Sequence, residues 1–333
     1  MTALSRQQLR SVPKVELHIH LEGTFRPARV VELAALAGEE PPRPADRLFE
    51  ADNLADFLQT LDWVCGLVRD EPTAEQVAYD FATYAHDQGI VYAEVILNPT
   101  HWSGLTTAEL FPACARGFDR AQADGLGDFR LLPSILRQQS EQEALHLVEW
   151  IEGAGLDRIV GLSIDGNEEA AGRTGPRFAS AYAHAARIGL GCTAHAGESS
   201  GAEGVRDAIE LLGVSRIDHG VRCAEDPEVL GMVLERGITL NVCLTSNSTL
   251  LYSSLEDHPI RGLAAAGVLF TINTDDPETL GISLCSELEI AAEHLNWNAS
   301  DLIEAQHRAV DAAFCSEADK RALRALIDHT VGM

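Results

Sequence analysis

The sequence predicts an α/β protein whose strands close into a (β/α)8, or TIM, barrel. Short apolar or β-branched runs recur along the 333 residues, and each is followed by a segment of helical periodicity. From the third run onward the runs begin about 23 to 32 residues apart, the length of one β-loop-α-loop unit. Such alternation implies parallel strands joined by right-handed crossovers. The eight runs span residues 15–21, 91–97, 129–136, 159–165, 191–196, 216–219, 239–244 and 268–273.

The segments between the runs carry the signals of amphipathic helices. Apolar residues recur at positions i, i+3, i+4 and i+7 of 144–151, and they also line one face of 77–85. Asp226 is the expected N-cap of a further helix, which Gly237 is expected to end. The alternative fold, an open doubly wound sheet, requires a Gly-rich phosphate-binding turn after an early strand. Residues 20–24, His-Leu-Glu-Gly-Thr, are not such a turn, which favours the barrel.

Two additions to the barrel are expected. Residues 25–75 separate the first strand from its return helix, and we predict that they form a mostly helical lid over the barrel mouth. Phe57, Trp63 and Phe81 either line this lid or pack in the core, and core packing is the more usual role of aromatic residues at helical spacing. Nothing marks a second domain, so the whole chain, 1–333, is predicted to be one domain. Two or three helices should follow the last strand, around 284–294, 299–312 and 317–330.

Composition and charge exclude several classes of protein. Hydrophobic residues make up 46% of the chain and charged residues 23%, which is ordinary globular usage. The 51 acidic and 25 basic side chains give a net charge of −26, which disfavours nucleic-acid polymers and anionic membranes as partners. The first 14 residues lack the apolar segment of a signal peptide, and no stretch approaches the roughly 18 apolar residues of a membrane span. Seven scattered cysteines without a Cys-x-x-Cys pair predict reduced thiols in a cytoplasmic protein.

Candidate catalytic residues lie at the ends of the predicted strands. His18 and His20 are two apart in the first strand, so both side chains face the barrel axis. Further histidines and aspartates end the fifth, sixth and eighth strands, where barrel enzymes place their catalytic groups. Each motif alone has a structural explanation as a turn or a helix N-cap, but together they aim several imidazoles and a carboxylate at one cavity. This donor set suits Zn²⁺ or another borderline divalent ion.

Four motifs carry a resemblance to a known family. They are Pro-Lys-Val-Glu-Leu-His-Ile-His-Leu-Glu-Gly-Thr at 13–24, His-Ala-Gly-Glu at 195–198, Arg-Ile-Asp-His-Gly at 216–220 and Asn-Thr-Asp-Asp-Pro at 273–277. In this order the set resembles the adenosine/adenine deaminase family of the amidohydrolase superfamily. Supporting matches occur at 165–168, 246–247 and 257–259.

The resemblance implies a mononuclear zinc site, with one Zn²⁺ per chain, in a distorted barrel. The implied ligands are His18, His20, His195 and Asp275. The cation lowers the pKa of a bound water from 15.7 toward about 7, which provides hydroxide at neutral pH. The implied reaction is hydrolytic: oxygen replaces the C6 amino group of a 6-aminopurine, and ammonia leaves.

The resemblance also implies roles for individual side chains. His219 orients the attacking water and helps to take its proton, while Asp275 accepts a hydrogen bond from the same water. A protonated Glu198 donates to N1 of the purine, and burial is the means of keeping it protonated. Asp276 contacts N7 and the backbone N–H of Gly166 contacts N3, so that the two fix how the ring is presented.

Three other kinds of protein are less consistent with these motifs. Deaminases that act on DNA and RNA use a zinc set with Cys-x-x-Cys, which this chain lacks. A metal-dependent phosphoesterase or lactonase usually needs a bridging carboxylate or a carbamylated lysine, and no lysine follows the fourth strand. A non-catalytic barrel should have lost a ligand or the acid, whereas every position is filled here. A small purine is therefore the expected partner, and the oligomeric state stays open.

The identity of the purine depends on the residue at position 22. Adenosine deaminases usually read His-Leu-Asp-Gly here, with the Asp implied to hold the ribose; this chain has Glu22, as adenine deaminases tend to have. Relatives that act on aminodeoxyfutalosine also carry His-Leu-Glu-Gly, and other N6-substituted purines stay open. Glu22 follows His20 by two residues, so we expect it on the strand, at the cavity rim and on the same side as the ligands.

Overall fold

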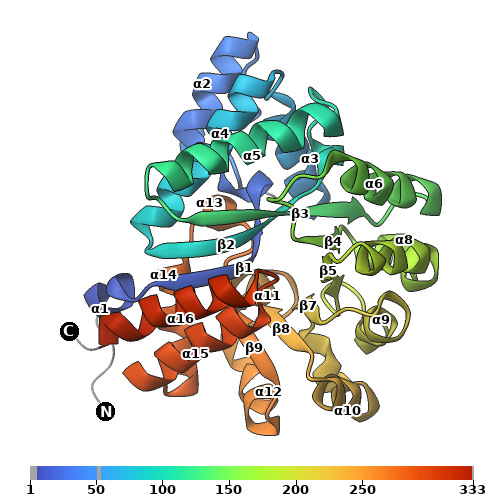
Figure 1. The fold of residues 1–333 in the computed structure, drawn as a ribbon, viewed down its shortest axis with the longest axis vertical. Coiled ribbons are helices and arrows are strands. Elements are labelled where there is room, and N and C mark those ends of the chain that lie inside the picture. Colours follow the sequence, from blue (N-terminus) through green and yellow to red (C-terminus); the bar gives the residue numbers. More distant parts are fainter. Residues whose placement is uncertain (1–5, 51–53, 332–333) are drawn as a thin grey trace.

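The computed structural model describes residues 6–50 and 54–331 and contains the predicted barrel of parallel strands (Figure 1). Each strand pairs in parallel with the next along the chain, in the orders β1-β2-β3-β4-β5 and β6-β7-β8-β9. The strands are β1 (Lys14–His20), β2 (Ile90–Leu97), β3 (Asp128–Leu136), β4 (Gly161–Asp165), β5 (Gly191–Cys192), β6 (His195–Ala196), β7 (Arg216–His219), β8 (Thr239–Val242) and β9 (Leu269–Ile272).

The barrel closes between its first and last strands. Ile19 of β1 forms a parallel bridge with Asp275, which follows β9. The backbone N–H of His20 donates to the carbonyl of Asp275 (2.9 Å), and the N–H of Asp275 donates to the carbonyl of His18 (3.1 Å). This closure brings together a histidine pair and an aspartate that are about 255 residues apart in the sequence.

The predicted fifth strand, 191–196, is interrupted in the structure. It consists of β5 and β6, separated by Thr193 and Ala194, so one strand was expected where two short ones occur. The N–H of Thr193 still donates to Leu162 of β4 (3.0 Å), and the carbonyl of Ala194 accepts from Asp218 of β7 (2.9 Å). The backbone there therefore bonds alternately to its two neighbours, and the wall of the barrel continues through the break.

The predicted helices surround the strands, and the two capping residues predicted for one of them are present. The periodic segment 144–151 lies in α6, whose N-cap Ser140 forms a capping box with Glu143. Asp226 caps α10 with its side chain, and Gly237 ends that helix at φ 61°. The outer helices include α4 (Glu71–Asp87), α5 (Thr107–Ala123), α6 (Glu141–Ala154), α8 (Gly175–Arg187), α9 (Ala202–Asp207), α10 (Pro227–Arg236) and α12 (Ile260–Ala266).

The segment after β1 contains two longer helices, α2 (Pro27–Ala37) and α3 (Leu54–Gly66), before the return helix α4. In Figure 1 these helices lie at one end of the molecule, together with α5. Phe81 packs in the core against Phe118 and Phe129, and Trp63 donates from its ring N–H to Glu39 (2.9 Å). Neither ring contributes to the large cavity described below. The side chain of Phe57 lies outside the described residues.

The three helices expected after the last strand are present. They are α14 (Leu284–Leu295), α15 (Ala299–Ala312) and α16 (Glu317–Val331), and short α13 (Pro277–Leu280) precedes them. A further short helix, α1 (Arg6–Ser11), was not predicted. None of the helices in the described part of the chain is long and apolar enough to cross a membrane.

A polar cluster fills the end of the barrel opposite the strand termini that carry the histidines. Arg216, at the start of β7, pairs with the buried carboxylate of Glu94 (2.6 Å), and its guanidinium lies 3.8 Å from the ring centre of Phe314. Gly191 leaves space for that ring, because a Cβ there would lie 2.2 Å from a Phe314 ring carbon. Phe314, in the segment before α16, thus packs at this end of the barrel, and the large cavity lies at the opposite end.

Candidate active site

Five of the predicted site residues meet at the carboxyl ends of the strands. His18 and His20 belong to β1, His195 begins β6, His219 ends β7 and Asp275 follows β9. All of these side chains are buried or nearly so. They adjoin a cavity of about 960 Å³, whose lining includes His20, His195 and Asp275. The site therefore lies where barrel enzymes carry out their chemistry.

Four of these side chains point their donor atoms at one another. Nε2 of His195 lies 3.1 Å from Nε2 of His18 and 3.0 Å from Nε2 of His20. Oδ1 of Asp275 lies 3.1 Å from His18 Nε2 and 3.4 Å from His20 Nε2. A tetrahedral ion with bonds of about 2.0–2.1 Å requires donor separations of roughly 3.3–3.4 Å, close to those observed. The donor set consequently fits a divalent metal ion.

His219 lies against the same cluster. Donor atoms of His18, His195, His219 and Asp275 all fall within 4.8 Å of one another, so His219 borders the position that a metal ion would take. Nε2 of His219 lies 3.9 Å from Asp275 and 3.5 Å from Oε1 of Glu198. Burial lowers the pKa of His219 to about 3, so the ring is neutral at pH 7.

A second layer of polar groups orients the imidazoles. Nδ1 of His18 lies 3.3 Å from the carbonyl of Asn241 and therefore donates to it, which leaves Nε2 as the free donor atom for a metal. Oδ2 of the fully buried Asp218 lies 3.5 Å from Nδ1 of His195. The amide of Asn241 also donates to Asp218 (2.7 Å). Neither residue was predicted to have a role in the site, although Asp218 lies inside the Ile-Asp-His-Gly motif.

The backbone is strained at two of the site residues. His219 has φ 61° and Asp275 has φ 68°; in the described chain only Asn296 shares this feature among residues other than glycine. Left-handed φ values cost free energy for residues with a Cβ and persist where the surrounding structure imposes them. Here they accompany the turn of His219 and Asp275 toward the cluster of donor atoms.

Glu198 lies in the loop after β6, with its side chain 17% exposed to the cavity. Burial, reinforced by the negative charges of Asp275 and Glu168, raises its pKa to about 8. A carboxyl group with this pKa is mostly protonated at pH 7, so it can donate a hydrogen bond to a heterocycle. This raised pKa agrees with the role that the resemblance implies for Glu198, and that role stays a prediction.

A hydrogen-bond chain determines the tautomer of His219. The N–H of Ile260 donates to Nδ1 of His258 (3.1 Å), so the neutral His258 carries its proton on Nε2, which donates to Oδ1 of Asn247 (3.3 Å). The Asn247 amide nitrogen then donates to Nδ1 of His219 (3.0 Å). In the neutral ring the proton consequently resides on Nε2, the nitrogen that lies toward Glu198 and Asp275.

Asp276 and Gly166 line the same cavity on different sides. Burial and the charges of Asp275 and Glu22 raise the pKa of Asp276 well above its usual value. Gly23 packs against Asp276 so closely that a Cβ would lie 2.6 Å from the Asp276 Cα. This approach is the physical reason for the glycine in the His-Leu-Glu-Gly segment.

Glu22 lines the cavity, but it does not lie on the strand as expected. β1 ends at His20, and Glu22 belongs to the 3₁₀ turn η1 (Leu21–Thr24). Its Oε1 accepts from the backbone N–H of Asn98 and from the ring N–H of Trp102, both at 2.8 Å. The side chain is 1% exposed, so it is anchored inside the wall and does not lie free at a rim.

Comparison with known proteins identifies the chain. A (β/α)8 barrel with this donor set belongs to the metal-dependent hydrolases of the amidohydrolase type. Within that class the chain belongs to the adenosine deaminase family, because the sequence profile described as adenosine deaminase matches residues 13–330. It is a hydrolytic deaminase.

Its relatives carry three different substrate names. The chain is 37% identical over 307 residues to an aminodeoxyfutalosine deaminase of Acidothermus cellulolyticus, covering 88% of this chain and 85% of the relative. It is 32% identical to an adenine deaminase of Chlorobium luteolum (97% and 96% covered) and 33% identical to an adenosine deaminase of Erwinia tasmaniensis (94% and 97% covered). These relatives show the family, but their names give three different substrates.

Two solved structures share the fold over nearly the whole chain. The adenine deaminase of Arthrobacter aurescens has a TM-score of 0.89 at 27% identity, covering 97% of this chain and all of that one. An amidohydrolase of Burkholderia ambifaria, solved with bound Zn, has a TM-score of 0.89 at 30% identity, with 100% and 96% covered.

Proposed function

We propose that this protein is a zinc-dependent deaminase of a 6-aminopurine base or nucleoside, with one Zn²⁺ per chain. The observation that carries the proposal is the pairing, in one cavity, of a tetrahedral donor set with a carboxyl group held protonated. Nε2 of His18, His20 and His195 and Oδ1 of Asp275 would hold the ion. When bound, the ion lowers the pKa of a water molecule toward neutrality, which makes that water a nucleophile at pH 7.

Glu198 is the proposed acid. Its raised pKa keeps a proton on the carboxyl group, and that proton is donated to N1 of the purine as C6 is attacked. Donation at N1 neutralises the charge that the ring would otherwise develop when its aromaticity is lost. Because Glu198 lies 3.5 Å from His219, the two side chains are close enough to act on the adjacent ring atoms N1 and C6.

His219 is proposed to orient the attacking oxygen. With its proton on Nε2, the ring donates toward the cavity, and Asp275 accepts from Ser246 (2.7 Å) beside it. Of the two roles implied for His219, this tautomer favours the orienting one over the removal of a proton. We further propose that Asp276 contacts N7 and that the N–H of Gly166 donates to N3.

The size of the cavity favours a substrate larger than a free base. Its volume of about 960 Å³ lies near the upper end of the roughly 300–1,000 Å³ of ordinary ligand pockets. An aminodeoxyfutalosine-type nucleoside, with a substituent on its ribose, is the second candidate; the 37% identical relative of that name supports it. All seven cysteines are free thiols, which favours a reducing compartment, and we propose that the protein is cytoplasmic.

The test is an ammonia-release screen of the zinc-loaded protein. Adenine, adenosine, 2′-deoxyadenosine, N6-substituted purines and aminodeoxyfutalosine are each supplied, and release is compared by kcat/KM. The proposal expects at least one of these to be deaminated at C6 and one zinc per chain by elemental analysis. Release from none of them by metal-loaded, folded protein would contradict it.

A further inference from the structure

The loop that carries Glu198 is held from behind by one buried carboxylate. Oε2 of Glu168 accepts from the backbone N–H of Glu198 (2.8 Å) and of Ser200 (3.2 Å), while Oε1 accepts from the N–H of Gly197 (3.2 Å). The N–H of Glu168 in turn donates to Oγ of Ser199 (2.9 Å). Four consecutive loop residues, 197–200, therefore take their position from this single residue.

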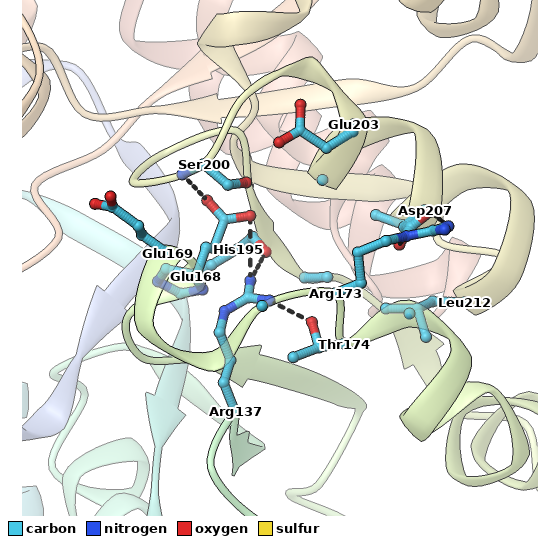
Figure 2. A pocket seen from close by; sticks show the side chains of 15 residues that line it. Arg137, Glu168, Glu169, Arg173, Thr174, His195, Ser200, Glu203, Asp207 and Leu212 are labelled. Atoms are coloured by element: carbon cyan, nitrogen blue, oxygen red, sulfur yellow. Dashed lines mark hydrogen bonds and ion pairs between the residues drawn. The ribbon is translucent and has the colours of Figure 1, made fainter.

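Arg137 completes this support from the other side. Its Nε donates to the carbonyl of Gly166 (3.1 Å), its Nη1 donates to Thr174 (2.7 Å) and its Nη2 donates to the carbonyl of His195. Nη2 also lies 3.8 Å from Oε1 of Glu168. Figure 2 shows the guanidinium between Thr174, His195 and Glu168, with Ser200 donating to Glu168 above it.

The contacts of this pair join two parts of the cavity that the mechanism uses separately. Glu168 bonds to the residue proposed to protonate N1, and Arg137 bonds to the glycine proposed to contact N3 and to the metal-binding His195. Gly166 and Glu198 are 32 positions apart in the sequence and belong to loops after different strands. The pair is thus the direct connection between the N1 side and the N3 side of the base site.

A contribution to the free energy of unfolding does not by itself explain why Arg137 and Glu168 form a buried ion pair. Arg137 is 4% exposed and Glu168 is 3% exposed, and a buried ion pair commonly contributes little net stability because both charges must lose their water. Every oxygen of Glu168 is nevertheless used by the loop, in a geometry that an uncharged amide cannot reproduce. An amide in place of the carboxylate would put an N–H₂ group against a backbone N–H or against the guanidinium.

We propose that Glu168 and Arg137 are positioning residues for deamination, which set the place of the Glu198 carboxyl group relative to the base contacts at Gly166 and to His195. The proposal rests on the proposed function. Neither residue touches the substrate. A displacement of about 1 Å in a reacting group lowers turnover by up to about 100-fold, whereas binding of the base depends on several other contacts. Loss of the pair should therefore lower kcat more than it raises KM.

The test compares Glu168→Gln with Glu203→Gln in metal-loaded protein, using the substrate that wild type deaminates best. Glu203 is a matched control, because it borders the same cavity of about 280 Å³ behind the loop but contacts the N–H of Gly201. We expect Glu168→Gln to lower kcat about 10- to 100-fold with KM within about threefold and metal content unchanged. Glu203→Gln should stay within about twofold of wild type.

A double variant decides whether Glu168 acts through Glu198. If it does, adding Glu168→Gln to Glu198→Gln should lower kcat by less than about threefold further, because the displaced acid is already inactive. Losses that multiply in full would overturn the proposal, as would a Glu168→Gln enzyme with wild-type kcat.

A second variant covers the case in which Glu168→Gln does not fold, judged from its thermal unfolding midpoint and metal content. Arg137→Lys keeps the charge but cannot bridge Gly166, His195 and Thr174 together, so kcat should fall by a similar factor with KM preserved. Wild-type kcat in this variant would contradict the proposal. Absence of ammonia release in wild type would instead contradict the proposed function, so the two failures are distinguishable.

Discussion

The amide nitrogen of Asn247 lies 3.0 Å from Nδ1 of His219, and this contact places the imidazole proton on the nitrogen that faces the cavity. The amide can only donate, since its oxygen is occupied by His258 at 3.3 Å. The residue that selects the tautomer thus belongs to α11 (Leu244–Leu250), after β8, whereas His219 ends β7. A contact between the ends of two neighbouring strands, β7 and β8, therefore determines how His219 interacts with the attacking oxygen.

Asn247→Asp is predicted to lower kcat/KM by about tenfold or more with metal still bound. A carboxylate accepts from Nδ1 and so moves the donor hydrogen of the neutral ring away from Nε2. Preserved or increased activity would show that Nε2 acts as a base. Asn298→Asp, the same change at the N-cap of α15, is the control and should leave activity unchanged.

Glu198→Gln is predicted to lower kcat by roughly 10²–10⁴, the usual contribution of a positioned general acid, with metal content and substrate affinity similar to wild type. His219→Ala should lower kcat by a comparable factor. The two losses should combine to less than their product, because both groups act in one transition state. A Glu198→Gln enzyme within about threefold of wild type would mean that another group protonates the purine.

Activity is predicted to fall as the pH rises through about 8. The raised pKa of Glu198 means that the carboxyl keeps its proton at neutral pH and loses it on the alkaline side. Because the protonated form is the proposed active form, the loss appears as a descending alkaline limb in kcat/KM. Profiles measured between roughly pH 6 and pH 10 should show this limb in wild type and lack it in Glu198→Gln.

Removal of the metal is predicted to abolish turnover and to lower the thermal unfolding midpoint. Three imidazoles and a carboxylate crowd together at donor distances of 3.0–3.4 Å, so without an ion they repel or compete for protons. Zn²⁺ should restore both properties. Elemental analysis of active protein that finds two metals per chain, or none, would contradict the mononuclear site.

Glu22→Asp is predicted to raise kcat/KM for adenosine relative to adenine by about tenfold or more. The shorter side chain cannot keep both bonds to Asn98 and Trp102, so its carboxylate moves and the wall gains space for a ribose. Trp102→Phe, which removes one of these donors without shortening Glu22, is the companion variant and should shift the ratio in the same direction by a smaller factor. An unchanged ratio in Glu22→Asp would assign substrate choice to the residues of 25–75.

Most of the barrel was predictable because its signals are local. A short apolar run indicates a strand, and the period and the capping residues indicate a helix; Asp226 begins α10 and Gly237 ends it, as predicted. The break at Thr193 and Ala194 was not predicted. The backbone of these residues still bonds to β4 on one side and to β7 on the other, as in any interior strand, so no local signal marks the break.

The candidate site likewise contains some residues whose positions follow from the sequence and others whose contacts depend on the closed fold. His18 and His20 share a face because side chains alternate along any strand, and the position of His219 and Asp275 follows from the rule that catalytic groups gather at strand ends. The position of Glu22 was predicted wrongly, because the residue at which a strand ends depends on the strands that pair with it. The roles of Asp218, Arg137 and Glu168 were missed, although Glu168 lies inside a recognised match, because each acts on a backbone or ring distant in the sequence.

By itself, then, the sequence determined the order of strands and helices, the class of chemistry and the chain positions of the groups proposed to bind the metal and to donate the proton. Tertiary structure alone decided which nitrogen of His219 carries the proton, which side chain holds the Glu198 loop and how Glu22 is anchored. These outcomes depend on hydrogen bonds near 3 Å between residues 28 to 80 positions apart. Hydrogen bonds weaken steeply with distance and angle, so they follow from the closed fold and not from local pattern.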